Sequence, residues 1–219
     1  PEMAALHDRA VEKGVLVLNE IGLDPGIDHL SAKQVLDRIE AEGGRMLEFE
    51  SYCGGLIAPD SDNNPWHYKF SWNPRNVVLA GQGGPATFLA GGAHRLVPPH
   101  RVFQNARTIS VGGTSFEGYP NRDSVAYVEK YGLSGIKTLV RGTLCGEGFC
   151  AGWDALIQLG CVRDDVHMSW PKGTSWADWL RSFVPAQWAE VGLESAVVRV
   201  TRCSDESLSR LRWLGLFDE

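Results

Sequence analysis

The sequence predicts an α/β protein: the end of a doubly wound parallel sheet, followed by a mixed α/β domain and a helical segment. Two observations carry this prediction. An apolar run at residues 15–19 (VLVLN) stands between two helical patterns, an order typical of parallel α/β sheets. From residue 45 onward, segments alternate apolar and polar positions as strands do, whereas amphipathic helical patterns dominate after residue 142.

We expect three domains. Residues 1–44 contain the last strand and helices of the parallel sheet, residues 45–141 a mixed α/β domain, and residues 142–219 a mainly helical domain. A chain of 219 residues is long enough for this division and for a sizeable core. Because Pro1 is not a natural initiator, we expect earlier strands of the sheet to lie upstream of it.

The N-terminal elements meet at a turn, DPG. Residues 2–13 predict a helix that ends at Gly14, residues 15–19 a buried strand, and residues 27–42 a second helix. Asp24 is a good N-cap, Pro25 suits the first helical position, and Gly26 lets another group approach the backbone closely. Ligands bind in front of such turns in open α/β sheets, and a capped helix with nothing in front is the alternative.

The middle of the chain predicts strands and one glycine-rich turn. MLEFESYCGG at 46–55 alternates as an antiparallel strand does, and further strand-like segments lie near Leu96, at 108–111 and at 116–119. A strand-like VVLA precedes residues 81–86, which fit the spacing G-x-G-x-x-A. A dinucleotide fingerprint also needs an acidic residue about 20 positions on. Residues 95–110 contain none, so we interpret 81–86 as a glycine-rich turn.

Composition excludes several classes of protein. The 21 basic and 27 acidic residues give a net charge of −6, and neither sign of charge forms long runs. The sequence therefore lacks the basic patches expected of a protein that binds nucleic acid or an anionic membrane. No apolar stretch approaches the ~20 residues of a membrane span. The five cysteines include no CxxC pair, so neither a metal site nor a disulfide framework is favoured. We therefore expect reduced thiols and a cytoplasmic location.

Several longer motifs together carry a family resemblance. NEIGLDPGIDHL, SYCGGL, APDSDNNPWHYKFSWNPR, YPNRDS and RGTL occur in this order between residues 19 and 144, and WLGLF closes the chain. In these motifs the chain resembles the bacterial-type saccharopine dehydrogenases, in the glutamate-forming branch of the family, also called saccharopine reductases. The resemblance implies a fragment that lacks most of a Rossmann domain, including its glycine-rich loop.

The resemblance also implies an activity. Such enzymes use NAD or NADP to oxidise saccharopine, a small molecule in which the side-chain nitrogen of lysine is joined to a glutamate skeleton. Hydride leaves the carbon next to nitrogen, and water hydrolyses the resulting imine to glutamate and aminoadipate semialdehyde. A homodimer is implied as well. Because the fragment lacks the pyrophosphate cradle, we expect almost no dehydrogenase activity from these 219 residues alone.

The family motifs assign roles to particular residues. Leu23, Asp24 and Pro25 match a turn that touches the cofactor, and Asn73 falls at another cofactor-contacting position. Asp24 and Cys53 match positions at the reacting centre. The substrate-binding positions are matched by Arg122, Thr143, Leu144 and Cys145.

Each assignment has a structural alternative. Arginine's planar fork suits the three carboxylates of saccharopine, but Arg122 can instead pair with Asp123. Cys53 can act as an acid or base, since a thiol titrates near ~8.5, or it can be a small buried residue. Asp24 can be a base or only a cap. Four further residues are weaker candidates: Arg75 and Arg141 for carboxylates, His29 for proton relay, and His67, which we interpret as loop structure.

One position departs from the family. Where relatives usually read RGTLR or RGTIR, this chain has Cys145 after Leu144. Losing a charge-assisted bond to a carboxylate costs ~1.5–3 kcal/mol, roughly 10- to 150-fold in affinity. Three explanations are open: another cation binds the carboxylate in place of the missing arginine, the substrate differs from saccharopine, or saccharopine binds weakly. Two alternative functions therefore stay open: a relative acting on another amino-acid or carboxylated polyamine adduct, and a non-catalytic dimerisation module.

Overall fold

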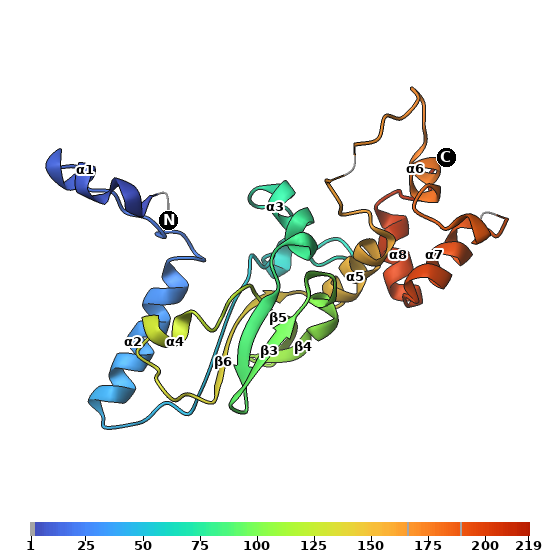
Figure 1. The fold of residues 1–219 in the computed structure, drawn as a ribbon. Helices are drawn as coiled ribbons and strands as arrows, with labels where there is room; N and C mark the ends of the chain where they lie inside the picture. The colour runs from blue at the N-terminus through green and yellow to red at the C-terminus, as the bar shows by residue number, and fades with distance from the viewer. Residues whose placement is uncertain (1–2, 166, 189) are drawn as a thin grey trace. The chain divides into compact units, whose positions relative to one another are not determined.

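The computed structural model describes residues 3–165, 167–188 and 190–219 (Figure 1). The chain divides into two compact units, Pro1–Arg45 and Met46–Glu219. None of the helices in the described ranges is long and apolar enough to cross a membrane. The three-domain division expected from the sequence stays a prediction.

The first unit contains three helical elements. These are η1 (Ala4–Leu6), α1 (His7–Glu12) and α2 (Ile27–Ala41), which confirm the two predicted helices. Gly14 follows α1 with φ 62°, the left-handed geometry expected after a helix. The strand predicted at residues 15–19 is wrong for this structure, because the segment is not paired with any strand of the described residues. Its apolar side chains are exposed, with Leu16 at 80%.

The turn before α2 differs from the prediction. The N-cap of α2 is Gly26, and Asp24 lies two residues earlier in the turn, so the prediction of Asp24 as the cap is wrong. The side chain of Asp28 accepts a hydrogen bond from the Gly26 N–H at 2.7 Å. A Cβ at Gly26 would overlap the Gly22 carbonyl oxygen and lie 2.7 Å from the Gly22 nitrogen. Because Gly26 has no side chain, the backbone of Gly22 in the same chain can approach it closely.

The second unit is built on one mixed six-stranded sheet, in the order β3-β2-β6-β5-β4 with β1 also paired to β6. This confirms the mixed α/β class. The strands near Leu96, at 108–111 and at 116–119 are confirmed within β3, β4 and β5. The predicted antiparallel pairing of residues 46–55 is wrong, because β1 runs parallel to β6. The strands are β1 (Glu48–Cys53), β2 (Ala86–Ala90), β3 (Ala93–Val97), β4 (Arg107–Val111), β5 (Thr114–Pro120) and β6 (Thr138–Cys145).

The expected strand VVLA is helical. Asn73 caps α3 (Pro74–Val78) by accepting the Arg75 N–H at 3.0 Å, and Pro74 occupies the first helical position. The 3₁₀ helix η3 (Leu79–Gln82) continues this segment, so residues 81–86 do not follow a strand. The remaining helices are α4 (Tyr127–Lys130), α5 (Phe149–Leu159), α6 (Trp176–Arg181), α7 (Leu193–Thr201) and α8 (Asp205–Trp213), with short 3₁₀ turns η2 (Pro59–Ser61), η4 (Pro99–Arg101), η5 (Phe103–Asn105) and η6 (Ala186–Trp188).

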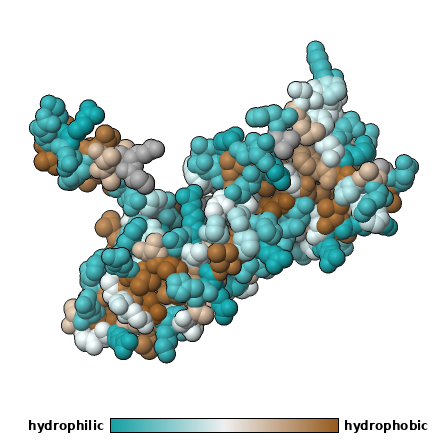
Figure 2. Space-filling view, viewed as in Figure 1, coloured by the Kyte–Doolittle hydropathy of each residue, from teal (hydrophilic) through white to brown (hydrophobic). Residues whose placement is uncertain are grey.

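The main hydrophobic core surrounds α5. Phe149 stacks on Trp153, and Trp66 meets both rings edge-on. Leu180 of α6 and Leu211 of α8 are fully buried in the same cluster. Apolar side chains also reach the surface over the α6–α8 end of this unit (Figure 2), among them Trp176, Trp213 and Leu214. The core thus fixes the end of β6 from which α5 begins.

Candidate substrate-binding site

The parallel register of β1 and β6 brings two of the predicted site residues together. Cys53, the last residue of β1, is the direct partner of Thr143 in β6. On the other side of β6, Thr143 is paired with Tyr119 of β5. Directly paired residues point to the same face of a sheet, and neighbouring strands lie about 4.8 Å apart. Cys53, Thr143 and Tyr119 therefore form a short row across one face, which we call the Thr143 row.

Beyond the Thr143 row, the backbones of β1 and β6 touch. Gly54 follows Cys53 and lies against the backbone of Leu144. A Cβ at Gly54 would overlap the Leu144 carbonyl oxygen and lie 2.9 Å from the carbonyl carbon. The motifs SYCGGL and RGTL thus contact each other directly through backbone atoms, because Gly54 has no side chain to keep them apart.

Arg122 lies in the turn after β5 with an exposed side chain. Its φ of 48° is left-handed, a conformation that costs a non-glycine residue on the order of 1–3 kcal/mol and that clusters at functional sites. The alternative of an ion pair with Asp123 is not what the described residues show. Asp123 instead accepts hydrogen bonds from the Thr87 hydroxyl at 2.6 Å and the Ala126 N–H at 3.2 Å.

Two residues that the sequence reasoning missed hold this turn. Thr87 of β2 bonds to it through backbone and hydroxyl groups. The fully buried Ser124 hydroxyl accepts the Arg141 N–H at 2.9 Å and donates to the Arg141 carbonyl at 3.3 Å. The Asp-Ser pair of YPNRDS was visible in the sequence as a turn signal, but its partners in β2 and β6 were not.

Cys145 lies in the core rather than at the surface. Its side chain is 4% exposed and lies beside Cys150 and Tyr119. A hydrogen bond with Cys145, followed by burial, raises the pKa of Cys150 well above its usual range. Burial likewise raises the pKa of Tyr119, whereas its hydrogen bond with Thr143 opposes the shift. The substrate-binding role of Cys145 and of Leu144 stays a prediction, and the burial of Cys145 favours a contact through its backbone.

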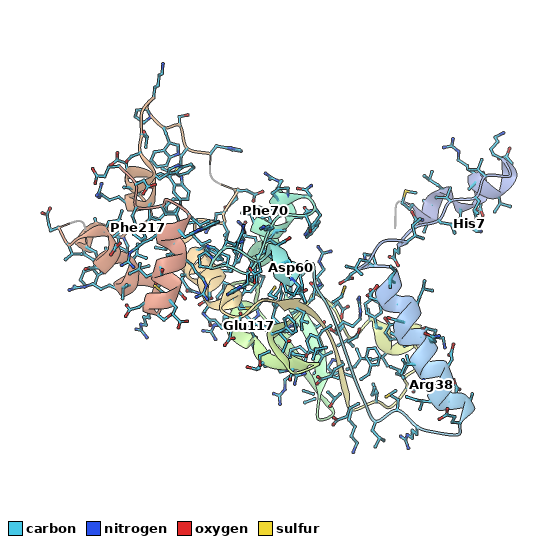
Figure 3. All side chains as sticks on the ribbon, turned by 180° about the vertical axis from the view of Figure 1, so that it is seen from behind. His7, Arg38, Asp60, Phe70, Glu117 and Phe217 are labelled. Carbon is cyan, nitrogen blue, oxygen red and sulfur yellow. The ribbon has the colours of Figure 1, made fainter. Side chains whose placement is uncertain are left out.

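The carboxylate of Glu117 lies beside the buried cluster of Cys145, Cys150 and Tyr119. Glu117 of β5 is directly paired with Cys145, and its Oε2 accepts the Cys150 N–H at 2.7 Å. Glu117 therefore lies where β5 meets the first turn of α5 (Figure 3). A negative charge at a helix N-terminus is favourable, so Glu117 helps to fix the start of α5 against the sheet.

The thiols are expected to differ in reactivity. Burial raises the pKa of Cys161 to about 12, so that at pH 8 it should alkylate about a thousandfold more slowly than an ordinary thiol. Cys145 and Cys150 should also stay unmodified, because both are almost fully buried. Timed iodoacetamide labelling with peptide mass spectrometry measures these rates, and labelling in urea is the control. Rapid modification of Cys161 in the folded protein would contradict the expectation.

The weaker candidates have structural contacts. Arg75 pairs with Asp164, and His67 bonds to Asp62 at 2.6 Å within its loop. The Arg141 guanidinium lies 4.1 Å above the Tyr127 ring. His29 lies 3.8 Å from Asp28. Among the described residues, no three His, Cys, Asp or Glu side chains are grouped as ligands for a metal ion.

The predicted cofactor-contacting residues fit that role only in part. Leu23, Asp24 and Pro25 are exposed in the turn before α2. Asn73 is exposed, but its side-chain oxygen is used to cap α3. Its NH₂ group is the part that remains suitable for a ligand. Leu23, Asp24 and Pro25 belong to the first unit and Asn73 to the second, so their joint role stays a prediction.

Comparisons with known proteins agree with these motifs. The chain is 36% identical over 226 residues to saccharopine dehydrogenase [NADP(+), L-glutamate-forming] of Saccharomyces cerevisiae, covering all of this chain and 50% of the yeast protein. It is 38% identical over 169 residues to the mitochondrial alpha-aminoadipic semialdehyde synthase of Mus musculus, covering 76% of this chain and 18% of the mouse protein. The chain thus spans about half the length of its fungal relative.

A solved structure supports the same relationship. Apo histidine-tagged saccharopine dehydrogenase (L-Glu forming) from Saccharomyces cerevisiae matches with a TM-score of 0.83 and 35% identity, covering 99% of this chain and 50% of that one. The family model of the saccharopine dehydrogenase C-terminal domain matches residues 22–218. The chain belongs to the saccharopine dehydrogenase C-terminal domain family.

Proposed function

We propose that this chain supplies the substrate-binding part of an NADP- or NAD-dependent oxidoreductase that oxidises saccharopine to glutamate and aminoadipate semialdehyde. One observation carries the proposal: the direct pairing of Cys53 with Thr143, which unites two family motifs about 90 residues apart at one point of the sheet. The fungal relatives are named as NADP(+)-dependent enzymes, which favours NADP. A cytoplasmic homodimer remains part of the proposal.

The residues divide the work by their chemistry. Arg122 is exposed, and its neighbour Asp123 is bonded to Thr87 instead, so the Arg122 guanidinium binds a substrate carboxylate. The Thr143 hydroxyl offers a donor and an acceptor to a second polar group. Cys53, next to Thr143, is the proposed acid or base of the second unit. Asp24, in the first unit, is a separate candidate for catalysis that rests on the family motif.

The turn Leu23–Asp24–Pro25 of the first unit and the NH₂ group of Asn73 in the second unit are each a separate candidate contact for the cofactor. When bound, it accepts a hydride from the substrate carbon next to nitrogen. The chain's own contribution is to orient that carbon by its carboxylates and to keep the amine nitrogen within reach of a proton acceptor.

The test is turnover by the complete protein that contains this chain. We expect absorbance at 340 nm to rise with saccharopine and NADP, and more slowly with NAD. Arg122→Lys, which keeps the charge but loses the planar fork, should raise the KM for saccharopine about tenfold, a change worth ~1.4 kcal/mol. Arg95→Lys on the exposed strand β3 is the control. No turnover with either cofactor would refute the proposal.

A second substrate class is favoured by the missing arginine at position 145. Glu117 is directly opposite Cys145, so an arginine placed there meets a carboxylate across the strands. Activity with saccharopine in the Cys145→Arg variant, together with silence in the parent, would show that the substrate site of the parent has moved away from saccharopine.

A further inference from the structure

In the described chain, hydrogen bonds with one residue of β2, Thr87, hold the turn that carries Arg122. The Thr87 N–H donates to the Arg122 carbonyl at 2.8 Å, and the Ser124 N–H donates to the Thr87 carbonyl at 2.8 Å. The Thr87 hydroxyl donates to Asp123 Oδ1 at 2.6 Å. Three successive residues of the turn are thus held by one residue of the neighbouring strand.

Unlike the two backbone bonds, the bond from the Thr87 hydroxyl depends on the type of side chain at position 87. Any residue except proline can make the two backbone bonds at position 87, whereas only serine or threonine can make the third in this geometry. That bond is charge-assisted and short, and such bonds are roughly twice as strong as neutral ones. The pKa of Asp123 is lowered, first by the Thr87 hydroxyl and then by the Ala126 N–H, so the carboxylate stays ionised at neutral pH.

Asp123 is adjacent to Arg122 in the sequence, so its carboxylate is a potential competitor for the guanidinium. If its carboxylate turned toward Arg122, the two charges would neutralise each other and a substrate carboxylate would have to displace the pair. The bond to Thr87 points Asp123 toward β2 instead. Because Arg122 has left-handed geometry, its side-chain direction also depends on how firmly its neighbours are held.

We propose that Thr87 is a positioning residue for Arg122: its hydroxyl holds Asp123 away and keeps the Arg122 guanidinium available to a carboxylate of the substrate. The proposal rests on the proposed function, in which Arg122 binds that carboxylate. It adds a residue outside the recognised motifs, contributed by the strand after the glycine-rich turn.

The test compares Thr87→Val and Thr87→Ser in the complete protein. Valine keeps the shape and the backbone bonds, and we expect it to raise the KM for saccharopine roughly 5- to 10-fold with little change in kcat or in the KM for NADP. Serine keeps the hydroxyl and should restore the KM to within about twofold of the parent. A purely structural role would instead lower kcat or raise the KM values for saccharopine and NADP alike. An unchanged KM for saccharopine in Thr87→Val would overturn the proposal.

A double-mutant cycle tests the route through Asp123. Asp123→Ala removes the competing carboxylate, so alone it should leave the KM for saccharopine close to the parent value, and the double variant should lose most of the increase caused by Thr87→Val. A double variant with the same raised KM as Thr87→Val would overturn the proposal, and Thr87→Ala replaces Thr87→Val if the valine variant does not fold. Measuring saccharopine binding by calorimetry distinguishes a failure of the proposed function from a failure of the inference about Thr87. A parent that neither binds nor oxidises saccharopine refutes the proposed function and this inference, whereas equal binding by parent and Thr87→Val refutes the inference alone.

Discussion

Replacing Gly54 with alanine is expected to lower kcat/KM for saccharopine about 100-fold in the complete protein. The added Cβ would overlap the Leu144 carbonyl oxygen and lie 2.9 Å and 3.2 Å from the carbonyl carbon and Cα of the same residue. These are backbone atoms of β6, so no side-chain rotation can relieve the overlap. Either β1 or β6 must move, and Cys53 and Thr143 then lose their register.

The same substitution should also lower the free energy of unfolding by about 1–3 kcal/mol, as overpacking does elsewhere. Gly55→Ala is the matched control, because its Cβ would meet nothing closer than the Ser71 hydroxyl at 3.5 Å. Steady-state kinetics and urea unfolding of the two variants measure the contrast. Equal behaviour of Gly54→Ala and Gly55→Ala would show that the contact between β1 and β6 has no functional importance.

The helices of the second unit were largely predictable from the sequence. The patterns in AGWDALIQLG, WADWLRSFV and DESLSRLRWLGLF correspond to α5, α6 and α8, because each has one apolar face that packs on a core. The error at VVLA has a local cause. Its β-branched residues favour a strand, but Asn73 and Pro74 start a helix just before them, and that capping signal was present in the sequence.

Strand pairing was less predictable because it depends on distant parts of the chain. The alternation in EFESYC indicates a strand, but it does not say that the partner is β6 or that the two run parallel. Likewise, an apolar run at 15–19 becomes a strand only where neighbouring strands offer hydrogen bonds. Local pattern predicts the type of an element better than it predicts its partners.

The candidate site shows the same limit. Cys53, Arg122 and Thr143 were identified from family motifs, and the pairing of Cys53 with Thr143 follows from the β1–β6 register. Thr87 carries no motif and no unusual residue type, so nothing in its own neighbourhood indicates a role. Its importance arises from hydrogen bonds to a turn about 36 residues later in the chain.

Arg210 is the buried cation that joins two loops near the site. It is 9% exposed, and its Nε donates to the Pro65 carbonyl at 2.8 Å. Its Nη2 donates to the Glu147 carbonyl at 3.4 Å, two residues beyond Cys145. Its own carbonyl accepts the Trp66 indole N–H at 3.1 Å. One residue of α8 thus holds the loop before Trp66 against the loop between β6 and α5.

Arg210→Ala is expected to lower the free energy of unfolding by about 3–5 kcal/mol. The variant loses the hydrogen bonds of the charged guanidinium to two part-buried carbonyls, at ~1.5–3 kcal/mol each for a charged donor, and the deleted aliphatic stem leaves a cavity. Arg212→Ala on the same helix is the control. Its guanidinium makes a bidentate pair with Glu194 at 2.6 and 2.7 Å and lowers the Glu194 pKa, but the pair is exposed. Water replaces such contacts, so its loss should change stability little.

Arg210→Met separates the two contributions to the effect. Methionine refills most of the volume but donates no hydrogen bond, so it should recover only the part of the loss that comes from the cavity. The carbonyls of Pro65 and Glu147 would stay without their donor, and amide hydrogen exchange around residues 145–150 should remain faster than in the parent. If Arg210→Ala proved no more destabilising than Arg212→Ala in urea unfolding, the two carbonyl bonds would not hold the loops together. Because Glu147 follows the end of β6 so closely, such a result would also remove α8 as a support for the Thr143 row.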